Sequence, residues 1–117
     1  MDQIFEDIRQ GKTEAIKTFG HHVHWGYWKN PSMADGSIDD FANAAEDLTR
    51  RVCDAGDAKE GDRILDCGCG FGGTIASLSD RFTNMYLVGL NIDPRQLSRA
   101  KELVQRGGNK QTIIVGE

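Results

Sequence analysis

The chain has 117 residues, with 14 lysines and arginines against 18 aspartates and glutamates, which gives a formal charge of −4. This length fits one small domain. Acidic residues are in slight excess, and the sequence lacks the basic stripe that is typical of a nucleic-acid-binding protein. No apolar run is long enough to span a bilayer, and the acidic N-terminus lacks the pattern of a signal peptide. We therefore expect a cytoplasmic protein that binds no nucleic acid and has no membrane span.

The sequence of the N-terminal half predicts helices that are joined by a long loop. Apolar residues recur at helical spacing over 3–19 and are interrupted at Gly11, which predicts two short helices or one broken helix. Residues 20–36 contain the turn formers of a loop. A longer helix then begins at the capping residue Ser37 and has Gly56 at its C′ position. Its predicted apolar face consists of Phe41, Ala45, Leu48 and Val52.

The C-terminal half alternates strands and helices. The predicted elements are a strand at 63–67, a helix at 73–81 with Ile75 and Leu78 on one face, a strand at 86–91, a helix that starts at Asp93-Pro94 and ends at Gly107-Gly108, and a strand at 112–115. This order predicts an α/β fold, a βαβαβ half of a parallel, doubly wound sheet. We expect residues 1–60 to form a helical lid or cap segment and 61–117 to form a cofactor-binding half-domain.

The run Ile64-Leu65-Asp66-Cys67-Gly68-Cys69-Gly70-Phe71-Gly72-Gly73 places four glycines within six residues, directly after the first strand. Gly68 and Gly70 can adopt positive φ and carry no Cβ, so a ligand can approach the backbone there. The helix that follows offers free N–H groups and the positive end of its dipole. A tight turn whose glycines serve only packing is the alternative.

Asp66 decides which ligand we expect at this turn. The glycine spacing also fits the dinucleotide pattern, but a pyrophosphate would lie close to an uncompensated carboxylate. S-adenosylmethionine carries a net positive charge and would be favoured by it. Asp66 could instead accept backbone N–H bonds within the turn, and both roles are compatible. Asn91, at the end of the second strand, can donate to and accept from a ribose hydroxyl, or it can simply end the strand.

The three cysteines are Cys53, Cys67 and Cys69. Cys67 and Cys69 are too close in sequence for a natural disulfide, so we expect reduced thiols. A Cys-x-Cys metal site would need a second ligand pair, and no suitably spaced pair is present. We therefore expect no metal.

Several of these segments together resemble a known family. Asp66-x-Gly68-x-Gly70-x-Gly72 is similar to motif I of the class I S-adenosylmethionine-dependent methyltransferases. His24-Trp25-Gly26-Tyr27-Trp28 resembles a segment of tocopherol, sarcosine/dimethylglycine and natural-product small-molecule methyltransferases. Gly89-Leu90-Asn91-Ile92-Asp93, followed by Gln96, is similar to the same group. The resemblance implies a Rossmann-like fold and in-line methyl transfer to an O, N or C atom of a small molecule.

The resemblance also implies roles for individual residues. The methionine part of the cofactor would be lined by Asp66, Gly68, Cys69 and Gly70, whereas Asn91, Ile92 and the nearby Gln96 would hold the ribose and adenine. Tyr27 and Trp28 would fold over the cofactor, or else form a hydrophobic patch that packs on their own domain. Glu117 would meet the adenine amino group.

The family's sheet has more strands than the three predicted here, so we expect this chain to be the N-terminal portion of a larger enzyme, inactive alone. The first strand would then have an unpaired edge that a homo-oligomer, a domain swap or a complementing chain could cover. A non-catalytic half-domain and an NAD(P)-binding oxidoreductase half-domain remain alternatives. His21, His22 and His24 are candidates for a base, although lid or surface histidines without a proton-transfer role are the favoured interpretation; the catalytic residues and the methyl acceptor stay unknown.

Overall fold

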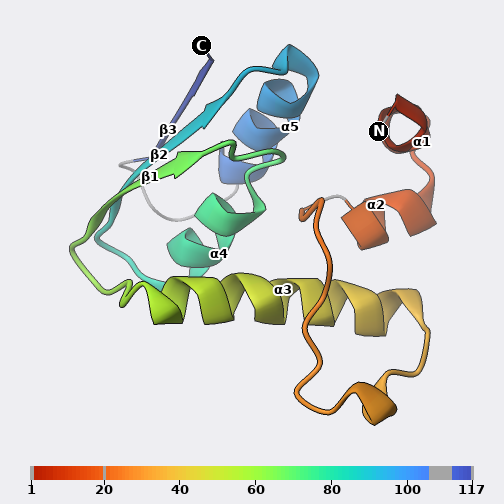
Figure 1. The fold of residues 1–117 in the computed structure, drawn as a ribbon. Helices are drawn as coiled ribbons and strands as arrows, with labels where there is room; N and C mark the ends of the chain where they lie inside the picture. Colours follow the sequence, from red (N-terminus) through yellow and green to blue (C-terminus); the bar gives the residue numbers. More distant parts are fainter. Residues whose placement is uncertain (1, 20, 106–111, 117) are drawn as a thin grey trace.

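The computed structural model describes residues 2–19, 21–105 and 112–116. Helices dominate the first half, and strands alternate with helices in the second (Figure 1). The elements are α1 (Asp2–Arg9), α2 (Thr13–Phe19), the 3-10 turn η1 (Pro31–Met33), α3 (Ile38–Ala55), β1 (Arg63–Cys67), α4 (Gly73–Arg81), β2 (Tyr86–Asn91), α5 (Pro94–Gln105) and β3 (Thr112–Gly116). The predicted α/β organisation with N-terminal helices is confirmed, and the break near Gly11 produces two helices. The predicted end of α5 at Gly107-Gly108 lies outside the described residues.

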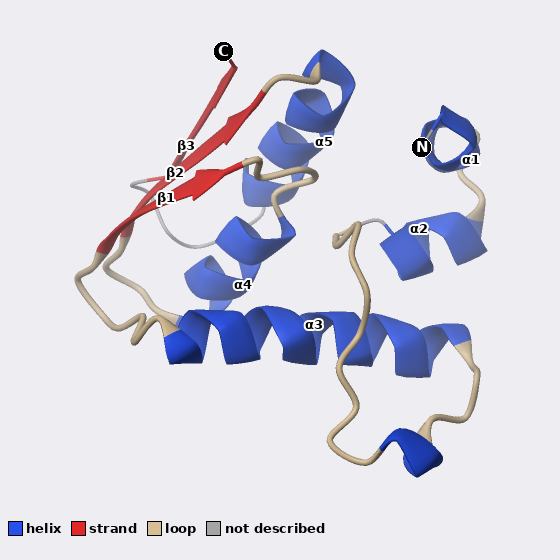
Figure 2. Ribbon diagram, in the orientation of Figure 1, coloured by secondary structure: helices blue, strands red, loops and turns tan. Residues whose placement is uncertain are grey.

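The strands form a parallel sheet in the order β1-β2-β3, with Leu65 opposite Val88 and Val88 opposite Ile113. Helices α4 and α5 lie together against one face of this sheet, and α3 runs across the end of the helical layer (Figure 2). Because all strands run in the same direction, their carboxyl ends share one edge of the sheet. The glycine-rich turn after β1 and the end of β2 therefore lie side by side there.

The core lies between α4 and the sheet. Ile75 and Leu78 of α4 pack with Met85 and Leu87, and all four are at most 1% exposed. Ile64 of β1 packs against this cluster, whereas its neighbour Leu65 is 57% exposed on the opposite side of the strand. Within the described residues β1 is an edge strand, as expected, and its exposed residues are Arg63, Leu65 and Cys67.

We expect Leu78→Ala to destabilise the protein by about 2–5 kcal/mol, because it removes buried methyl groups and leaves a cavity among neighbours that cannot fully close it. Val52→Ala is the matched control, since Val52 is 64% exposed, and should change the free energy of unfolding by less than about 0.5 kcal/mol. Urea denaturation measures both, and equal losses would contradict this assignment of the core.

Helix α3 begins as predicted, but its buried face differs from the prediction. The Ser37 hydroxyl accepts the Asp40 backbone N–H at 3.1 Å, as expected of an N-cap. The buried residues are Ala44, Ala45 and Thr49, so the prediction that Val52 faces the core is wrong. This buried face consists of small side chains because the preceding loop packs closely on α3. The Tyr27 N–H donates a hydrogen bond to the Ala44 carbonyl at 2.8 Å. At the C-terminus Asp57, not Gly56, adopts the left-handed conformation, with φ of 57°.

Helix α1 is attached to the glycine-rich turn and to the start of α5. The ring of Phe5 meets that of Phe71 edge-on, with centroids 5.4 Å apart, and the Arg95 guanidinium lies 4.3 Å from the Phe5 centroid. Arg95 also pairs with Asp2 at 2.9 Å. These contacts tie the first helix of the chain to the edge of the sheet where the strands end. Among the described helices, none is both long and apolar enough to cross a lipid bilayer.

Candidate functional site

The turn after β1 has the backbone that its glycines predict. Gly68 and Gly70 have positive φ, 78° and 56°. The N–H groups of Gly68 and Cys69 both donate to the Leu90 carbonyl, at 2.7 and 2.9 Å. The turn is therefore fastened to the end of β2, and its shape follows from glycine conformations that a side chain would strain.

A cavity of about 320 Å³ opens over this turn. Its walls come from the loop after α2, the end of β1, the turn itself, and the first residues of α4 and α5. The lining residues are His21, His22, Val23, His24, Asp66, Gly68, Cys69, Gly70, Phe71, Gly73, Thr74 and Gln96. Five residues predicted from the sequence to touch a cofactor thus share one cavity.

The glycines of the turn divide into two kinds. A Cβ on Gly68 would meet nothing within 4 Å, so this backbone faces open space. A Cβ on Gly72 would lie 3.1 Å from Cβ of Ala100, so Gly72 permits the close approach of α5. The two interpretations of the glycine run therefore apply to different residues: Gly68 leaves room for a ligand, and Gly72 serves packing.

Asp66 is an unpartnered carboxylate at the edge of the cavity. Among the described residues it forms no hydrogen bond or ion pair, so it does not stabilise the turn by accepting backbone N–H groups. Burial raises the pKa of Asp66 above its usual value of 3.8, and no neighbouring charge offsets that effect. A cationic group in the cavity would compensate this charge.

At the end of β2 the predicted residues interact with one another. The Asn91 side-chain amide donates to Oε1 of Gln96 at 2.5 Å, and its oxygen accepts the Ile92 N–H at 3.0 Å. Ile92 itself is 75% exposed. Asp93 accepts the Arg95 N–H at 2.9 Å, which confirms its role as the cap of α5. Gln96 thereby links Asn91 to the cavity, which Gln96 lines.

Tyr27 and Trp28 lie against α3 rather than over the turn. They line a separate cavity of about 450 Å³ together with residues of α3. The Trp28 indole N–H donates to Asp40 at 2.9 Å, and the Arg51 guanidinium lies 4.2 Å from the Tyr27 centroid. Packing on their own domain therefore describes both side chains in this structure, and contact with a cofactor stays a prediction. Glu117 lies outside the described residues.

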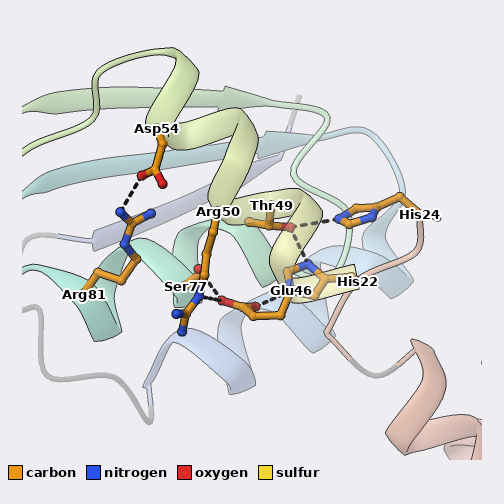
Figure 3. A network of polar contacts seen from close by, with 8 residues as sticks. All are labelled: His22, His24, Glu46, Thr49, Arg50, Asp54, Ser77 and Arg81. Carbon is orange, nitrogen blue, oxygen red and sulfur yellow. Dashed lines mark hydrogen bonds and ion pairs between the residues drawn. The ribbon is translucent and has the colours of Figure 1, made fainter. Parts of the chain in front are cut away.

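A buried polar network, absent from the sequence-based prediction, supports one wall of the cavity (Figure 3). Glu46 of α3 accepts hydrogen bonds from His22 at 2.7 Å, from Ser77 at 2.6 Å and from Arg50 at 3.2 Å. His22 is only 7% exposed, so it is not a surface histidine, and the absence of a proton-transfer role stays a prediction. Burial would raise the pKa of Glu46, but these hydrogen bonds outweigh burial and hold the pKa at about 2 instead of 4.5. The sequence signal that could have revealed the network is the pair Glu46 and Thr49, polar residues next to the small residues of the buried face of α3.

The depressed pKa of Glu46 predicts a loss of stability in acid. Its folded-state pKa of about 2 lies below the usual 4.5, so its contribution is complete above the usual value and is lost as the pH falls toward 2. Allowing for solvent screening, we expect a loss of roughly 1–2 kcal/mol over this range. Urea denaturation at a series of pH values should show this loss in the unmodified protein and a flatter profile in Glu46→Gln. Parallel profiles would show that the hydrogen bonds of Glu46 do not cause the loss of stability in acid.

Comparison with known proteins shows the family of the chain. Residues 24–116 match the family described as mycolic acid cyclopropane synthetase. Methyltransferase GfsG of Streptomyces halstedii is 38% identical over 95 residues, covering 81% of this chain and 32% of that protein. The 2-methyl-6-phytyl-1,4-hydroquinone methyltransferase of Synechocystis is 31% identical over 88 residues, covering 73% of this chain and 26% of the relative.

The fold is also shared with solved structures. The [4+2]-cyclase SpnF superposes with a TM-score of 0.74 at 22% identity, over 95% of this chain and 39% of that protein. The chain spans about a third of the length of the relatives it matches. Because the family match covers most of the chain, including the glycine-rich turn, the expected resemblance is confirmed. The chain belongs to the mycolic acid cyclopropane synthetase family of class I S-adenosylmethionine-dependent methyltransferases.

Proposed function

We propose that this chain binds S-adenosylmethionine over the glycine-rich turn, as the N-terminal portion of an enzyme that methylates a small molecule at O, N or C. The observation that carries the proposal is Asp66: a half-buried carboxylate without a partner beside the open backbone of Gly68. A cationic nucleoside gains from this charge, whereas a pyrophosphate would be repelled by it. The family membership of the chain supports the same cofactor.

The residues of the cavity fit the parts of this cofactor. Asp66, Gly68, Cys69 and Gly70 would hold its methionine part, and the linked pair Asn91 and Gln96, with the exposed Ile92, would meet ribose and adenine. When bound, the cofactor would supply a methyl group on a sulfonium; an acceptor atom would bond to the methyl carbon in line with the breaking carbon–sulfur bond, and S-adenosylhomocysteine would leave. The protein then chiefly aligns the reactants and excludes water.

The N-terminal residues have a covering role in this proposal. Residues 1–60 would form the cap segment and 61–117 the cofactor-binding half of the methyltransferase sheet. The contact of Phe5 with Phe71 supports this division, because it attaches α1 to the turn that would carry the cofactor. Tyr27 and Trp28 would complete the cover, and Glu117 would meet the adenine. We propose that the chain alone binds the cofactor without turnover, because it spans about a third of its relatives.

Calorimetric titration with S-adenosylhomocysteine and, separately, with NAD tests the proposal. We expect heat of binding with S-adenosylhomocysteine, and none with NAD. Binding of NAD alone would overturn the proposal in favour of an oxidoreductase half-domain. Binding of neither compound would favour the non-catalytic half-domain, whose exposed β1 edge and Leu65 would then take up a complementing chain.

A further inference from the structure

Two histidines of the cavity wall are joined through one buried hydroxyl. Thr49 of α3 is 3% exposed, and its Oγ1 lies 3.2 Å from Nδ1 of His22 and 3.0 Å from Nε2 of His24. The outer nitrogens of the two rings are engaged as well. Nε2 of His22 lies 2.7 Å from the Glu46 carboxylate, and Nδ1 of His24 lies 2.7 Å from the Trp25 carbonyl oxygen. Figure 3 shows the two rings converging on Thr49 from the loop.

These partners determine how many protons the two rings carry. A carboxylate and a carbonyl oxygen only accept, so Nε2 of His22 and Nδ1 of His24 must each carry a proton. The Thr49 hydroxyl has one proton and can donate it to only one of the two inner nitrogens. The other inner nitrogen must then donate to the hydroxyl oxygen. All four contacts are satisfied only when three of the four ring nitrogens are protonated, one proton more than two neutral imidazoles hold.

The extra proton has a compensating charge beside it. Glu46 is ionised, with its pKa held at about 2 by hydrogen bonds that outweigh burial, and it contacts His22 directly. The roles of His22 and His24 exchange when the protonated inner nitrogen gives its proton to the Thr49 oxygen while the hydroxyl gives its own proton to the other inner nitrogen, so the pair shares the proton. Other charged groups facing this region, besides the neighbouring His21, are Arg50 of α3, Lys17 of α2, Asp66 of β1, Asp80 of α4 and Arg99 of α5.

The pair holds the loop that forms one wall of the cavity. His22 and His24 line the same cavity as Asp66 and Gly68, and the hydrogen bonds to Thr49 and Glu46 fix their loop to α3. We propose that His22 and His24 are positioning residues of the cofactor site, held in place by a single proton that they share through Thr49. This inference rests on the proposed function, since it assigns the wall of the same cavity.

Nitrogen NMR of the histidine side chains at neutral pH tests the proton count in the protein itself. We expect three protonated ring nitrogens in the pair, with Nδ1 of His24 among them. Thr49→Val keeps the shape of the side chain but removes the bridge, and should leave two protonated nitrogens; Thr49→Ser should restore three. A count of two in the unmodified protein overturns the inference, whether or not the variants fold.

Titration with S-adenosylhomocysteine tests the positioning role. We expect Thr49→Ser to bind with the affinity of the unmodified protein, and Thr49→Val to bind roughly tenfold more weakly because it removes the hydrogen bonds that hold the loop. Unchanged binding by Thr49→Val, or an equal loss in Thr49→Ser, overturns the positioning role and leaves the proposed function intact. Absence of binding by the unmodified protein contradicts the proposed function instead, and the NMR count still decides whether the proton is shared.

Discussion

Asp66→Asn should weaken the binding of S-adenosylmethionine at least about tenfold while raising the thermal stability of the protein. The two effects have one cause. Burial raises the pKa of Asp66, so the ionised carboxylate opposes folding at pH values above its folded-state pKa, and this penalty disappears in acid below its unfolded-state pKa. The amide removes the penalty at neutral pH but also removes the charge that attracts a cationic ligand. Calorimetry and thermal denaturation at pH 7 measure the two quantities.

Asp57→Asn is the matched control for this experiment. It removes the same charge in the turn that precedes β1, where the Asp57 side chain is 87% exposed and pairs, within the part of the chain that the structure describes, only with Lys59. Asparagine also tolerates the left-handed backbone of Asp57. We expect unchanged binding and nearly unchanged stability. If both variants weaken binding equally, net charge rather than the position of Asp66 is responsible, and the proposed cofactor site loses its main support.

Gly73→Ala should detach the loop that carries the histidines from the start of α4. A Cβ at this position would collide with the His21 carbonyl oxygen and with the His22 ring. The His21 carbonyl belongs to the backbone, so rotating a side chain cannot relieve the collision and the loop that carries His21 must move. We expect a loss of about 1–3 kcal/mol in the free energy of unfolding and a marked loss of S-adenosylhomocysteine binding. Both tryptophans of the chain, Trp25 and Trp28, lie in this loop, so their fluorescence reports its displacement directly.

Gly56→Ala serves as the control for Gly73→Ala. Gly56 has φ of −81°, which alanine adopts without strain, and a Cβ there would make only ordinary contacts at 3.6 Å. Stability should change by less than about 0.5 kcal/mol, with unchanged tryptophan fluorescence and binding. If Gly73→Ala behaves like its control in all three measurements, the loop does not depend on close packing against α4.

The alternation of strands and helices after residue 62, the cap at Ser37 and the cap at Asp93 could all be predicted from the sequence. Each depends on neighbours within one turn of helix or a few residues of strand, so local pattern is sufficient. The positive φ of Gly68 and Gly70 could be predicted for the same reason. The family resemblance implied that Asp66 and Gln96 belong to one site, and both line the same cavity.

Tertiary structure alone decided which face of α3 is buried, which side chains form the cavity wall, and whether Asp66 has a partner. The helical spacing predicts Val52 on the buried face of α3, yet Ala44, Ala45 and Thr49 are buried and Val52 is exposed. The contacts of Thr49 with His22 and His24 join residues more than twenty positions apart. Helical periodicity identifies a stripe of side chains on a helix, but it contains no information about what a distant segment will place against that stripe.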